Sequence, residues 1–339
     1  MNDKNIYDKL QLVLSIKTKK KMLDEIDSIR ESIKDKEDMN NIYLLNELGQ
    51  ISQTNTVDRI HYYIKRLIKG ISEVKQGKYN DLNLNQWKRY DDVITDSLWL
   101  IDKRDQSGEH NAGYWGNFIP QIPAQLIKRY TKKNDWVLDT FLGSGTTMIE
   151  SIRQERNCIG IELNPSVIKD TQTIIEKERK NHQHNSLTSI IEGDSKKINL
   201  KEHLEKHNQE KVQLIIMHPP YWDIIKFSDN EKDLSNSETV DLFLKDFGEV
   251  VDNVSDYLEK DRYFAVVIGD KYTKGEWMPL GFYVMNEILK RDYKLKSLVV
   301  KNFEDTSAKA GQENLWRYRA LRGGFYIFKH EYILVFQKK

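Results

Sequence analysis

The sequence predicts a doubly wound α/β sheet with a mostly parallel core, preceded by a helical region. From Trp136 onward, short apolar runs alternate with amphipathic stretches, which is the pattern of strands joined by crossover helices. Before about residue 100, apolar residues instead recur at three- and four-residue spacing, as in Ile60, Ile64, Leu67 and Ile68. That segment contains no proline and few glycines, so helices are expected there.

Each element of the sheet follows from one apolar run. The expected strands are Trp136–Leu138, Cys158–Ile161, Ser189–Ile191, Val212–Ile216, Tyr263–Ile268, Lys296–Val300 and Tyr332–Phe336. Helices are expected between them at 146–153 and near 165–180, 199–208, 238–258 and 279–290. The polar, turn-rich stretch 102–113 suggests a boundary between a helical region, 1–105, and an α/β domain, 106–339.

Composition excludes several classes of protein. The 339 residues carry a formal net charge of +1, so any contact with nucleic acid must come from local patches of Lys and Arg. The single cysteine, Cys158, excludes an intrachain disulfide framework and a multi-cysteine metal site. No apolar run approaches the ~18 residues of a membrane span, and the first residues do not form a signal peptide, so a cytoplasmic protein is expected.

A glycine turn lies between the first strand and its helix, in Val137-Leu-Asp-Thr-Phe-Leu-Gly-Ser-Gly-Thr-Thr147. Gly143 and Gly145 allow a ligand to approach the backbone closely at the carboxyl edge of the sheet. A tight turn without a ligand is the plain alternative. A Walker A loop is excluded because no Gly-Lys-Ser/Thr follows, and the dinucleotide fingerprint is incomplete.

Carboxylates end the next two strands. Glu162 lies about twenty residues after the glycine turn, where a carboxylate accepts hydrogen bonds from the hydroxyls of a ribose. Asp194 ends the following strand and is placed to reach an adenine amino group. Either residue alone would be read as a solvated charge or an ordinary turn, but with the glycine turn they predict a nucleoside site.

The segment His218-Pro219-Pro220-Tyr221 closes the fourth strand at the same edge. Its two prolines fix the backbone and remove two N–H donors, which leaves carbonyl acceptors in defined directions. The exocyclic amino nitrogen of a base is a poor nucleophile because its lone pair is delocalised into the ring. Acceptors at the Pro219 carbonyl and the His218 side chain would localise that lone pair, while Tyr221 would stack on a base turned out of the duplex. A rigid loop with a packed aromatic is the alternative.

Together these segments resemble the DNA amino-methyltransferases, which make N6-methyladenine or N4-methylcytosine. The resemblance covers roughly residues 110–339 and makes 106–339 the catalytic domain. It implies a Rossmann-like methyltransferase fold with a seven-stranded sheet whose last strand is antiparallel. It also implies S-adenosylmethionine as cofactor, S-adenosylhomocysteine as product and no metal. The cofactor residues by resemblance, including the upstream Gly116–Pro123 segment, are Asn117, Pro120, Asp139, Phe141, Gly143, Ser144, Gly145, Thr146, Glu162 and Asp194.

Two features depart from that family. Residue 218 is His where the family commonly has Asp, Asn or Ser; because protonated His accepts no hydrogen bond, turnover should fall on acidification, and a His218→Asp enzyme with the same acid limb would contradict this. The sequence also ends at the last expected strand. Target recognition is therefore expected from the N-terminal helical region, for which dimerisation is the other expected role, or from loops.

Two patches combine cations with aromatic residues and are the expected nucleic-acid contacts. The first contains Lys65, Arg66 and Lys69 on a predicted helix, where a solvated basic face is the equal alternative. The second contains Arg317, Arg319 and Arg322 in a predicted glycine-containing loop before the last strand.

The sequence thus predicts a site-specific methyltransferase of bacterial or phage type that acts on duplex DNA by base flipping. It would act alone, as a homodimer, or beside a restriction or defence partner, and not at a membrane. The target base stays open: Trp222 favours cytosine N4, whereas the larger share of the family methylates adenine, so adenine N6 is favoured. The alternatives are an RNA or protein-amide methyltransferase and, from another class, a catalytically silent DNA-binding subunit.

Overall fold

The computed structural model describes residues 3–34, 39–110, 113–114, 116–303 and 313–339, which form two compact units, Met1–Val93 and Ile94–Lys339. The division falls upstream of the boundary expected at residue 105. The reason is that the two-residue strand β1 (Leu98–Trp99) already pairs with the sheet of the second unit. Residues 111 and 112 of the polar stretch lie outside the described residues.

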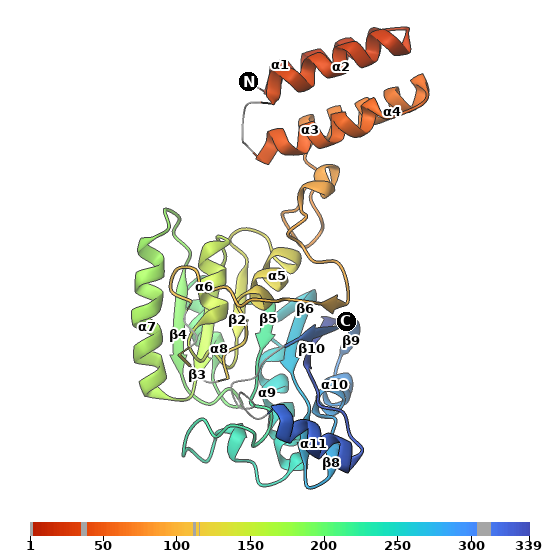
Figure 1. The fold of residues 1–339 in the computed structure, drawn as a ribbon. Helices are drawn as coiled ribbons and strands as arrows, with labels where there is room; N and C mark the ends of the chain where they lie inside the picture. Colours follow the sequence, from red (N-terminus) through yellow and green to blue (C-terminus); the bar gives the residue numbers. More distant parts are fainter. Residues whose placement is uncertain (1–2, 35–38, 111–112, 115, 304–312) are drawn as a thin grey trace. The chain divides into compact units, whose positions relative to one another are not determined.

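The first unit is helical, as its apolar spacing predicts. Its helices are α1 (Asp3–Ser15), α2 (Lys19–Ile33), α3 (Met39–Ser52) and α4 (Val57–Ser72), shown in red and orange in Figure 1. Their apolar faces form a core of their own that includes Leu10, Ile29, Leu48 and Ile64. Regular α-helix ends at residue 72 rather than near 100, and only the short 3₁₀ helix η1 (Leu84–Arg89) follows within this unit.

The second unit is built on an eight-stranded sheet with the order β1-β9-β10-β6-β5-β2-β3-β4. β10 pairs antiparallel with β6 and β9, and the other pairs are parallel, as expected. The predicted count of seven is one short because β1 is too short to give an apolar run. The strands after β1 are β2 (Trp136–Asp139), β3 (Asn157–Glu162), β4 (Thr188–Glu192), β5 (Val212–Met217), β6 (Leu258–Ile268), β9 (Tyr293–Asn302) and β10 (His330–Lys338).

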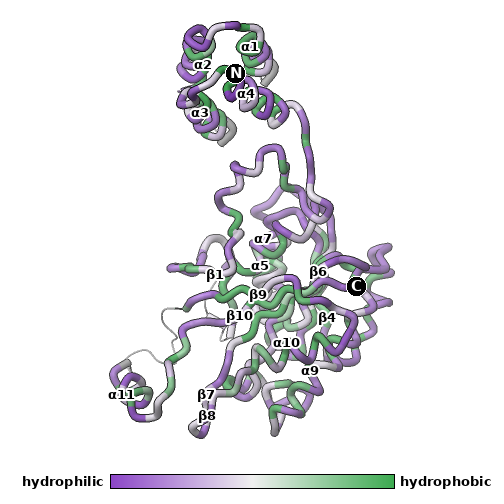
Figure 2. The backbone as a smooth tube through the Cα atoms, turned by 90° about the vertical axis from the view of Figure 1, so that its right-hand side faces the viewer, coloured by the Kyte–Doolittle hydropathy of each residue, from purple (hydrophilic) through white to green (hydrophobic). Residues whose placement is uncertain are grey.

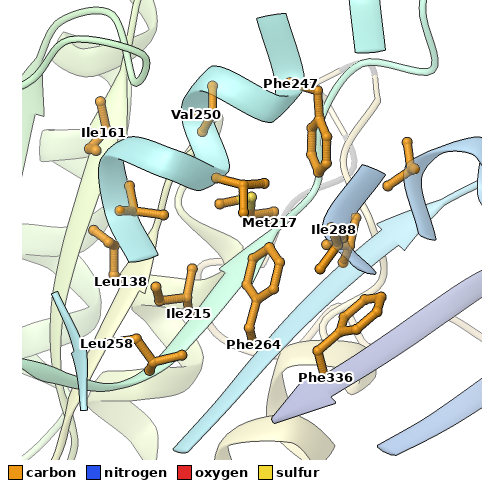
Figure 3. Packing of buried hydrophobic residues seen from close by; sticks show 14 of the residues in the cluster. Leu138, Ile161, Ile215, Met217, Phe247, Val250, Leu258, Phe264, Ile288 and Phe336 are labelled. Carbon is orange, nitrogen blue, oxygen red and sulfur yellow. The ribbon is translucent and has the colours of Figure 1, made fainter. Parts of the chain in front are cut away.

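Helices cover both faces of this sheet (Figure 1). One face carries α5 (Gln121–Tyr130), α6 (Thr146–Arg153) and α7 (Pro165–Lys180), and the other carries α8 (Leu200–Glu205), α9 (Val240–Ser255) and α10 (Leu280–Leu289). Figure 3 shows the core beneath α9 and α10, where Met217, Phe264 and Phe336 from three adjacent strands pack together. The central strands are correspondingly apolar (Figure 2).

The strand order creates the crevice in which a ligand can bind. The chain runs from β2 outward to β3 and β4, and then returns to β5 and β6 on the other side of β2. In such sheets the ligand site lies outside the carboxyl ends of the two strands where the order reverses. A ligand site is therefore expected outside the carboxyl ends of β2 and β5.

The segments that follow β6 and β9 leave the sheet at this same edge. They are the hairpin of β7 (Lys271–Thr273) and β8 (Glu276–Met278), and the helix α11 (Glu313–Gly323). The prediction of a loop for the second basic patch was wrong. The patch lies on α11, which contains three Arg and two Leu, both good helix formers. The helix ends at Gly323 and is followed by Gly324 in the left-handed conformation (φ +67°) that terminates helices. Within the described ranges, no helix has the length and apolar character needed to span a bilayer.

Candidate active site

A pocket lies at the carboxyl edge of the sheet, outside the ends of β2, β3, β4 and β5. Its empty space, which includes a part open to solvent, is about 840 Å³. Eight of the predicted site residues line it: Asn117, Phe141, Gly143, Ser144, Glu162, Asp194, His218 and Pro220. Behind this wall lie the other predicted residues: Pro120, Asp139, Gly145, Thr146, Pro219 and Tyr221.

The glycine turn forms the floor of the pocket. Gly143 and Gly145 have positive φ angles of +50° and +83°, and a Cβ atom on Gly145 would lie 2.8 Å from Thr171 Cγ2. The Thr171 hydroxyl also donates to the carbonyl of Gly143 at 2.8 Å, which ties the turn to α7. Glycine is therefore required at these positions for both conformation and space.

Glu162 is held beside this turn by two backbone donors. The N–H of Gly143 donates to Oε2 at 2.8 Å, and the N–H of Asn164 donates to Oε1 at 2.9 Å. Burial raises the pKa of Glu162 above its usual value. An ionised carboxylate has about four acceptor positions, so the group can still accept hydrogen bonds from a ligand that carries hydroxyls.

Two other carboxylates have one bonded and one orphaned oxygen. Asp194 Oδ1 accepts from the N–H of Lys196 at 2.9 Å, and Asp139 Oδ1 accepts from the N–H of Phe141 at 3.0 Å. The Oδ2 atom of each is buried and has no hydrogen-bond partner among the described residues. Asp139 is fully buried, and this burial raises its pKa to about 6. Asp194 lines the pocket, so its unpaired acceptor fits a ligand with an N–H donor, whereas Asp139 lies behind the wall.

The upstream segment contributes Gly116, Asn117 and Phe118 to the pocket lining. Asn117 accepts a hydrogen bond from the Thr146 hydroxyl at 2.6 Å, and Phe118 packs edge-on against the ring of His218, 4.8 Å between centroids. Arg104 donates to the backbone carbonyls of both Asn117 and Phe118. Thr146 and Pro120 do not line the pocket themselves. Thr146 holds the side chain of Asn117, and Pro120 is the N-cap residue of α5.

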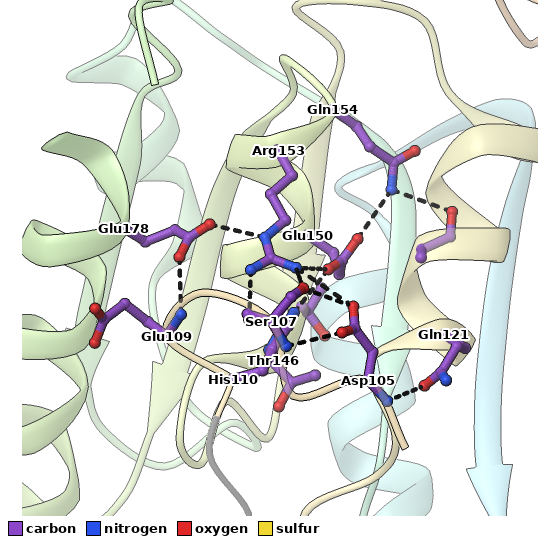
Figure 4. Close-up of polar contacts among 12 residues, drawn as sticks. Asp105, Ser107, Glu109, His110, Gln121, Thr146, Glu150, Arg153, Gln154 and Glu178 are labelled. Carbon is purple, nitrogen blue, oxygen red and sulfur yellow. Dashed lines mark hydrogen bonds and ion pairs between the residues drawn. The ribbon is translucent and has the colours of Figure 1, made fainter. Parts of the chain in front are cut away.

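An ion-pair network holds the chain just before this segment (Figure 4). Arg153 on α6 donates to Glu178 at 2.7 Å and to the carbonyl of Ser107 at 2.7 Å, while the ring of His110 contacts Glu150 at 2.7 Å. Asp105, His110 and Glu150 each have one possible metal-ligand atom, and these three atoms lie within 4.8 Å of one another. Here the Arg153 guanidinium already contacts Glu150 and Asp105, so a cation is supplied by the chain itself.

The His-Pro-Pro-Tyr loop follows β5 and meets the pocket next to the glycine turn, because β5 and β2 are adjacent. His218 and Pro220 face the pocket. Tyr221 turns inward, donating its hydroxyl hydrogen to Glu331 at 2.9 Å with His218 Nε2 at 3.1 Å. Burial lowers the pKa of His218 to about 4. The imidazole is therefore neutral at physiological pH and can accept a hydrogen bond.

Sequence reasoning missed part of the far wall. Phe227, Ser228, Lys232, Asp233 and Leu234 line the pocket from the polar segment after Trp222, which contains the 3₁₀ helix η2 (Leu234–Asn236). Tyr114 was also missed; it stacks on Phe227 with centroids 6.3 Å apart. The only signal in the sequence was the segment Asp233-Leu-Ser235, in which the Asp233 side chain accepts from the N–H of Ser235 and caps the short helix.

The two expected nucleic-acid patches lie on different units. Lys65, Arg66 and Lys69 lie on α4 in the first unit, where Arg66 pairs with the buried Glu47 at 2.6 Å. On α11, the side chains of Arg317, Arg319 and Arg322 are exposed. Phe325 beyond α11 stacks on Tyr272 of β7, 3.9 Å between ring centroids. This stacking fixes the α11 segment on the hairpin that follows β6.

Parts of the chain are similar in sequence to known methyltransferases. The chain is 34% identical over 97 residues to the Type II methyltransferase M.BglI of Bacillus subtilis (29% of this chain, 26% of that protein). It is 28% identical over 134 residues to M.MjaII of Methanocaldococcus jannaschii (37% and 24%) and 31% over 124 residues to M2.DpnII of Streptococcus pneumoniae (35% and 38%). The matched part thus spans about a quarter to two fifths of these relatives' lengths.

Solved structures resemble the chain at low identity. A methyltransferase described as dependent on S-adenosylmethionine from Methanosarcina mazei gives a TM-score of 0.43 at 12% identity, covering 63% of this chain and 96% of that one. TrmN from Thermus thermophilus gives 0.42 at 11%, covering 66% and 49%. The sequence also matches the DNA methylase family (N6_N4_Mtase) over residues 7–174 and 212–339. Since this match spans most of the chain and includes both strand-end motifs, the chain belongs to the N6/N4 DNA methylase family.

Proposed function

We propose that this protein transfers a methyl group from S-adenosylmethionine to an exocyclic amino nitrogen of a base in duplex DNA. The observation that supports this most directly is that the glycine turn at Gly143, the carboxylate of Glu162 and the ring of His218 line one pocket. A donor site and an acceptor site therefore adjoin each other within a single cavity.

The pocket residues fit the cofactor. Glu162 has free acceptor positions for the two ribose hydroxyls, and the orphaned Oδ2 of Asp194 suits the adenine amino group. The glycine turn leaves space where the rest of the cofactor approaches the backbone. When bound, S-adenosylmethionine supplies a methyl group already activated by its sulfonium, so the chain itself needs only to position and polarise the acceptor.

The acceptor nitrogen is activated by hydrogen bonding. His218, neutral because of its low pKa, accepts a hydrogen bond from one amino N–H, and the Pro219 carbonyl accepts one from the other. Both bonds draw the nitrogen toward a tetrahedral geometry and localise its lone pair for attack on the methyl carbon. A base inside a duplex cannot reach this depth, so base flipping is part of the proposal. The stacking role expected for Tyr221 is not part of it, because the Tyr221 side chain lies behind the pocket wall and donates to Glu331.

The target base is adenine N6 by preference, with cytosine N4 as the alternative. DNA from cells that express the protein should be sequenced with detection of both modified bases. N6-methyladenine at a fixed motif is the expected result. N4-methylcytosine instead would correct the base, and methylated RNA or protein amide with unmodified DNA would move the activity to the alternative substrates.

A catalytically silent DNA-binding subunit remains the rival from another class. Calorimetry with S-adenosylmethionine separates the two, because an intact donor site should bind it and a silent subunit should not. Duplex DNA, a second copy of the chain and a restriction or defence partner are the proposed partners, and the cytoplasm the proposed location. Size-exclusion chromatography with light scattering tests the homodimer.

A further inference from the structure

A buried chain of polar groups runs from the last strand of the sheet to the acceptor loop. Lys301 on β9 and Glu331 on β10 are cross-strand neighbours, and Lys301 Nζ lies 3.3 Å from Glu331 Oε1. The other carboxylate oxygen, Oε2, accepts the hydroxyl hydrogen of Tyr221 at 2.9 Å. Lys301 and Glu331 are only 5% and 8% exposed, so solvent does not compete for these bonds.

The direction of each hydrogen bond in this chain follows from counting protons. A tyrosine hydroxyl has one hydrogen, and Tyr221 gives it to the carboxylate of Glu331. Its oxygen is then an acceptor toward His218 Nε2, 3.1 Å away. A neutral imidazole carries one hydrogen, so if Nε2 holds it, Nδ1 keeps its lone pair. Burial and the nearby carboxylate raise the pKa of Tyr221 well above its usual value, so the hydroxyl stays protonated.

We propose that Glu331, acting through Tyr221, is a positioning residue that fixes the tautomer of His218 with the Nδ1 lone pair available to the pocket. The proposal rests on the proposed function for its purpose, since an acceptor on this loop is what an amino group requires. It also explains how a histidine can stand where the family uses residues with a side-chain oxygen: the opposite tautomer would present an N–H donor to the amino protons.

The substitution Glu331→Gln reverses the direction of the hydrogen bonds that run through Tyr221 to His218, while the shape of the side chain at position 331 stays the same. Lys301 orients the amide with its oxygen toward the ammonium and its NH2 group toward Tyr221. The NH2 then donates to the tyrosine oxygen, the hydroxyl hydrogen turns to His218 Nε2, and the imidazole hydrogen moves to Nδ1. Tyr221→Phe is the second variant, because it keeps the ring and removes the link. Tyr293→Phe is the matched control: its buried hydroxyl contacts Ser255 at 3.0 Å, at the start of β9 and away from the pocket.

The test is nitrogen NMR of protein labelled with ¹⁵N in its histidine rings, with the His218 signals assigned by their loss in His218→Asn. We expect protonated Nε2 in the wild type and in Tyr293→Phe, protonated Nδ1 in Glu331→Gln, and a mixture of both tautomers in Tyr221→Phe. A protonated Nδ1 in the wild type, or an unchanged tautomer in Glu331→Gln, would overturn the proposal.

Methyl transfer measured on the same samples separates this proposal from the proposed function. Glu331→Gln should lower the rate by roughly 10²-fold at saturating cofactor, as expected for the loss of one preorganised hydrogen bond to the reacting group, with little change in cofactor affinity. A wild type that shows the expected tautomer but methylates no nucleic acid leaves the tautomer control standing and removes the function. Methylation at the wild-type rate by a tautomer-reversed variant would instead overturn the positioning role alone.

Discussion

The backbone N–H of Gly143, in the turn after β2, donates a 2.8 Å hydrogen bond to Oε2 of Glu162, the last residue of β3. The turn that makes room for a ligand therefore also orients the carboxylate expected to bind it. Residues 142 and 161 reinforce this arrangement, since the N–H of Leu142 donates to the carbonyl of Ile161 at 2.9 Å. The glycine turn and the carboxylate of Glu162 therefore form one preorganised unit.

Glu162→Gln should lower the affinity for S-adenosylmethionine by about tenfold to a hundredfold. The two carboxylate oxygens already accept from the N–H groups of Gly143 and Asn164. In the variant an NH2 group replaces one of these acceptors and cannot accept a hydrogen bond from a ligand hydroxyl, which costs ~1–3 kcal/mol of binding free energy. Glu192→Gln is the matched control, because Glu192 ends the adjacent strand in register with Glu162 but is exposed. Equal affinity losses in the two variants, measured by calorimetry, would contradict this role.

Asp139→Asn should stabilise the ligand-free protein at neutral and alkaline pH. Burial raises the pKa of Asp139 to about 6 from its ordinary 3.8, so the folded state binds the proton more tightly than the unfolded state does. The stability of the wild type should therefore rise as pH falls from 8 through 6 toward 4. At pH 8 the ionised group costs about 3 kcal/mol, from the conversion of a pKa difference to free energy.

Urea unfolding of the wild type and Asp139→Asn at pH 8 and pH 5 measures this difference. The variant should be the more stable protein at pH 8, and the gap should narrow at pH 5. A variant less stable than the wild type at both values would show that the carboxylate is stabilised by its surroundings.

His218 should stay neutral through most of the acid range. Its pKa is about 4, lowered by burial and by Lys301 and raised in part by Glu331. Methyl transfer at saturating cofactor should therefore be unaffected by protonation of His218 from pH 8 to about 5, and should fall only near pH 4. The loss of activity at acid pH that the sequence alone predicts is therefore expected well below the pH range in which histidine ordinarily titrates.

His218→Asn provides the comparison, because its side-chain oxygen accepts a hydrogen bond and does not titrate. Single-turnover rates of both proteins across this range should show the limb near pH 4 only in the wild type. An identical fall in the variant would assign the limb to another group.

The sequence was sufficient for the fold because the strands of a buried parallel sheet are short apolar runs, and each predicted run became a strand. It was also sufficient for residues that carry their own motif, such as Gly143 and His218. The residues it missed act across large separations in the chain. Glu331 reads as an ordinary charge on the final strand, and its link to Tyr221 exists only because β10 lies next to β6.

The exposed arginines of α11 should contribute to DNA affinity. Replacing Arg317, Arg319 and Arg322 together with Gln should weaken duplex binding and reduce the slope of log affinity against log salt by up to about 3, since each phosphate contact contributes about 0.9. The control replaces three exposed lysines of α7, Lys169, Lys177 and Lys180, with Gln. Fluorescence anisotropy over a salt series measures both. Equal slopes for the two triple variants would remove α11 from the interface.

On α4, Arg66 and its neighbour Lys65 should behave differently. Arg66 donates to Glu47 at 2.6 Å, and Glu47 is only 3% exposed, with Lys88 as its second partner at 2.6 Å. Arg66→Ala should therefore destabilise the helical unit by about 1–3 kcal/mol, because it leaves a buried carboxylate oxygen without its donor. Lys65 is exposed, so Lys65→Ala should leave stability within about 0.5 kcal/mol.

Urea unfolding and duplex-binding titrations of both variants distinguish structure from recognition on this helix. If α4 contacts DNA, Lys65→Ala should weaken binding without a change in stability, because a contact to a DNA phosphate does not stabilise the free folded protein. If α4 is instead a solvated face, neither variant should alter binding once the folded fraction is taken into account. An Arg66→Ala protein as stable as the wild type would show that Lys88 alone satisfies Glu47, and Arg66 would then be available to a phosphate.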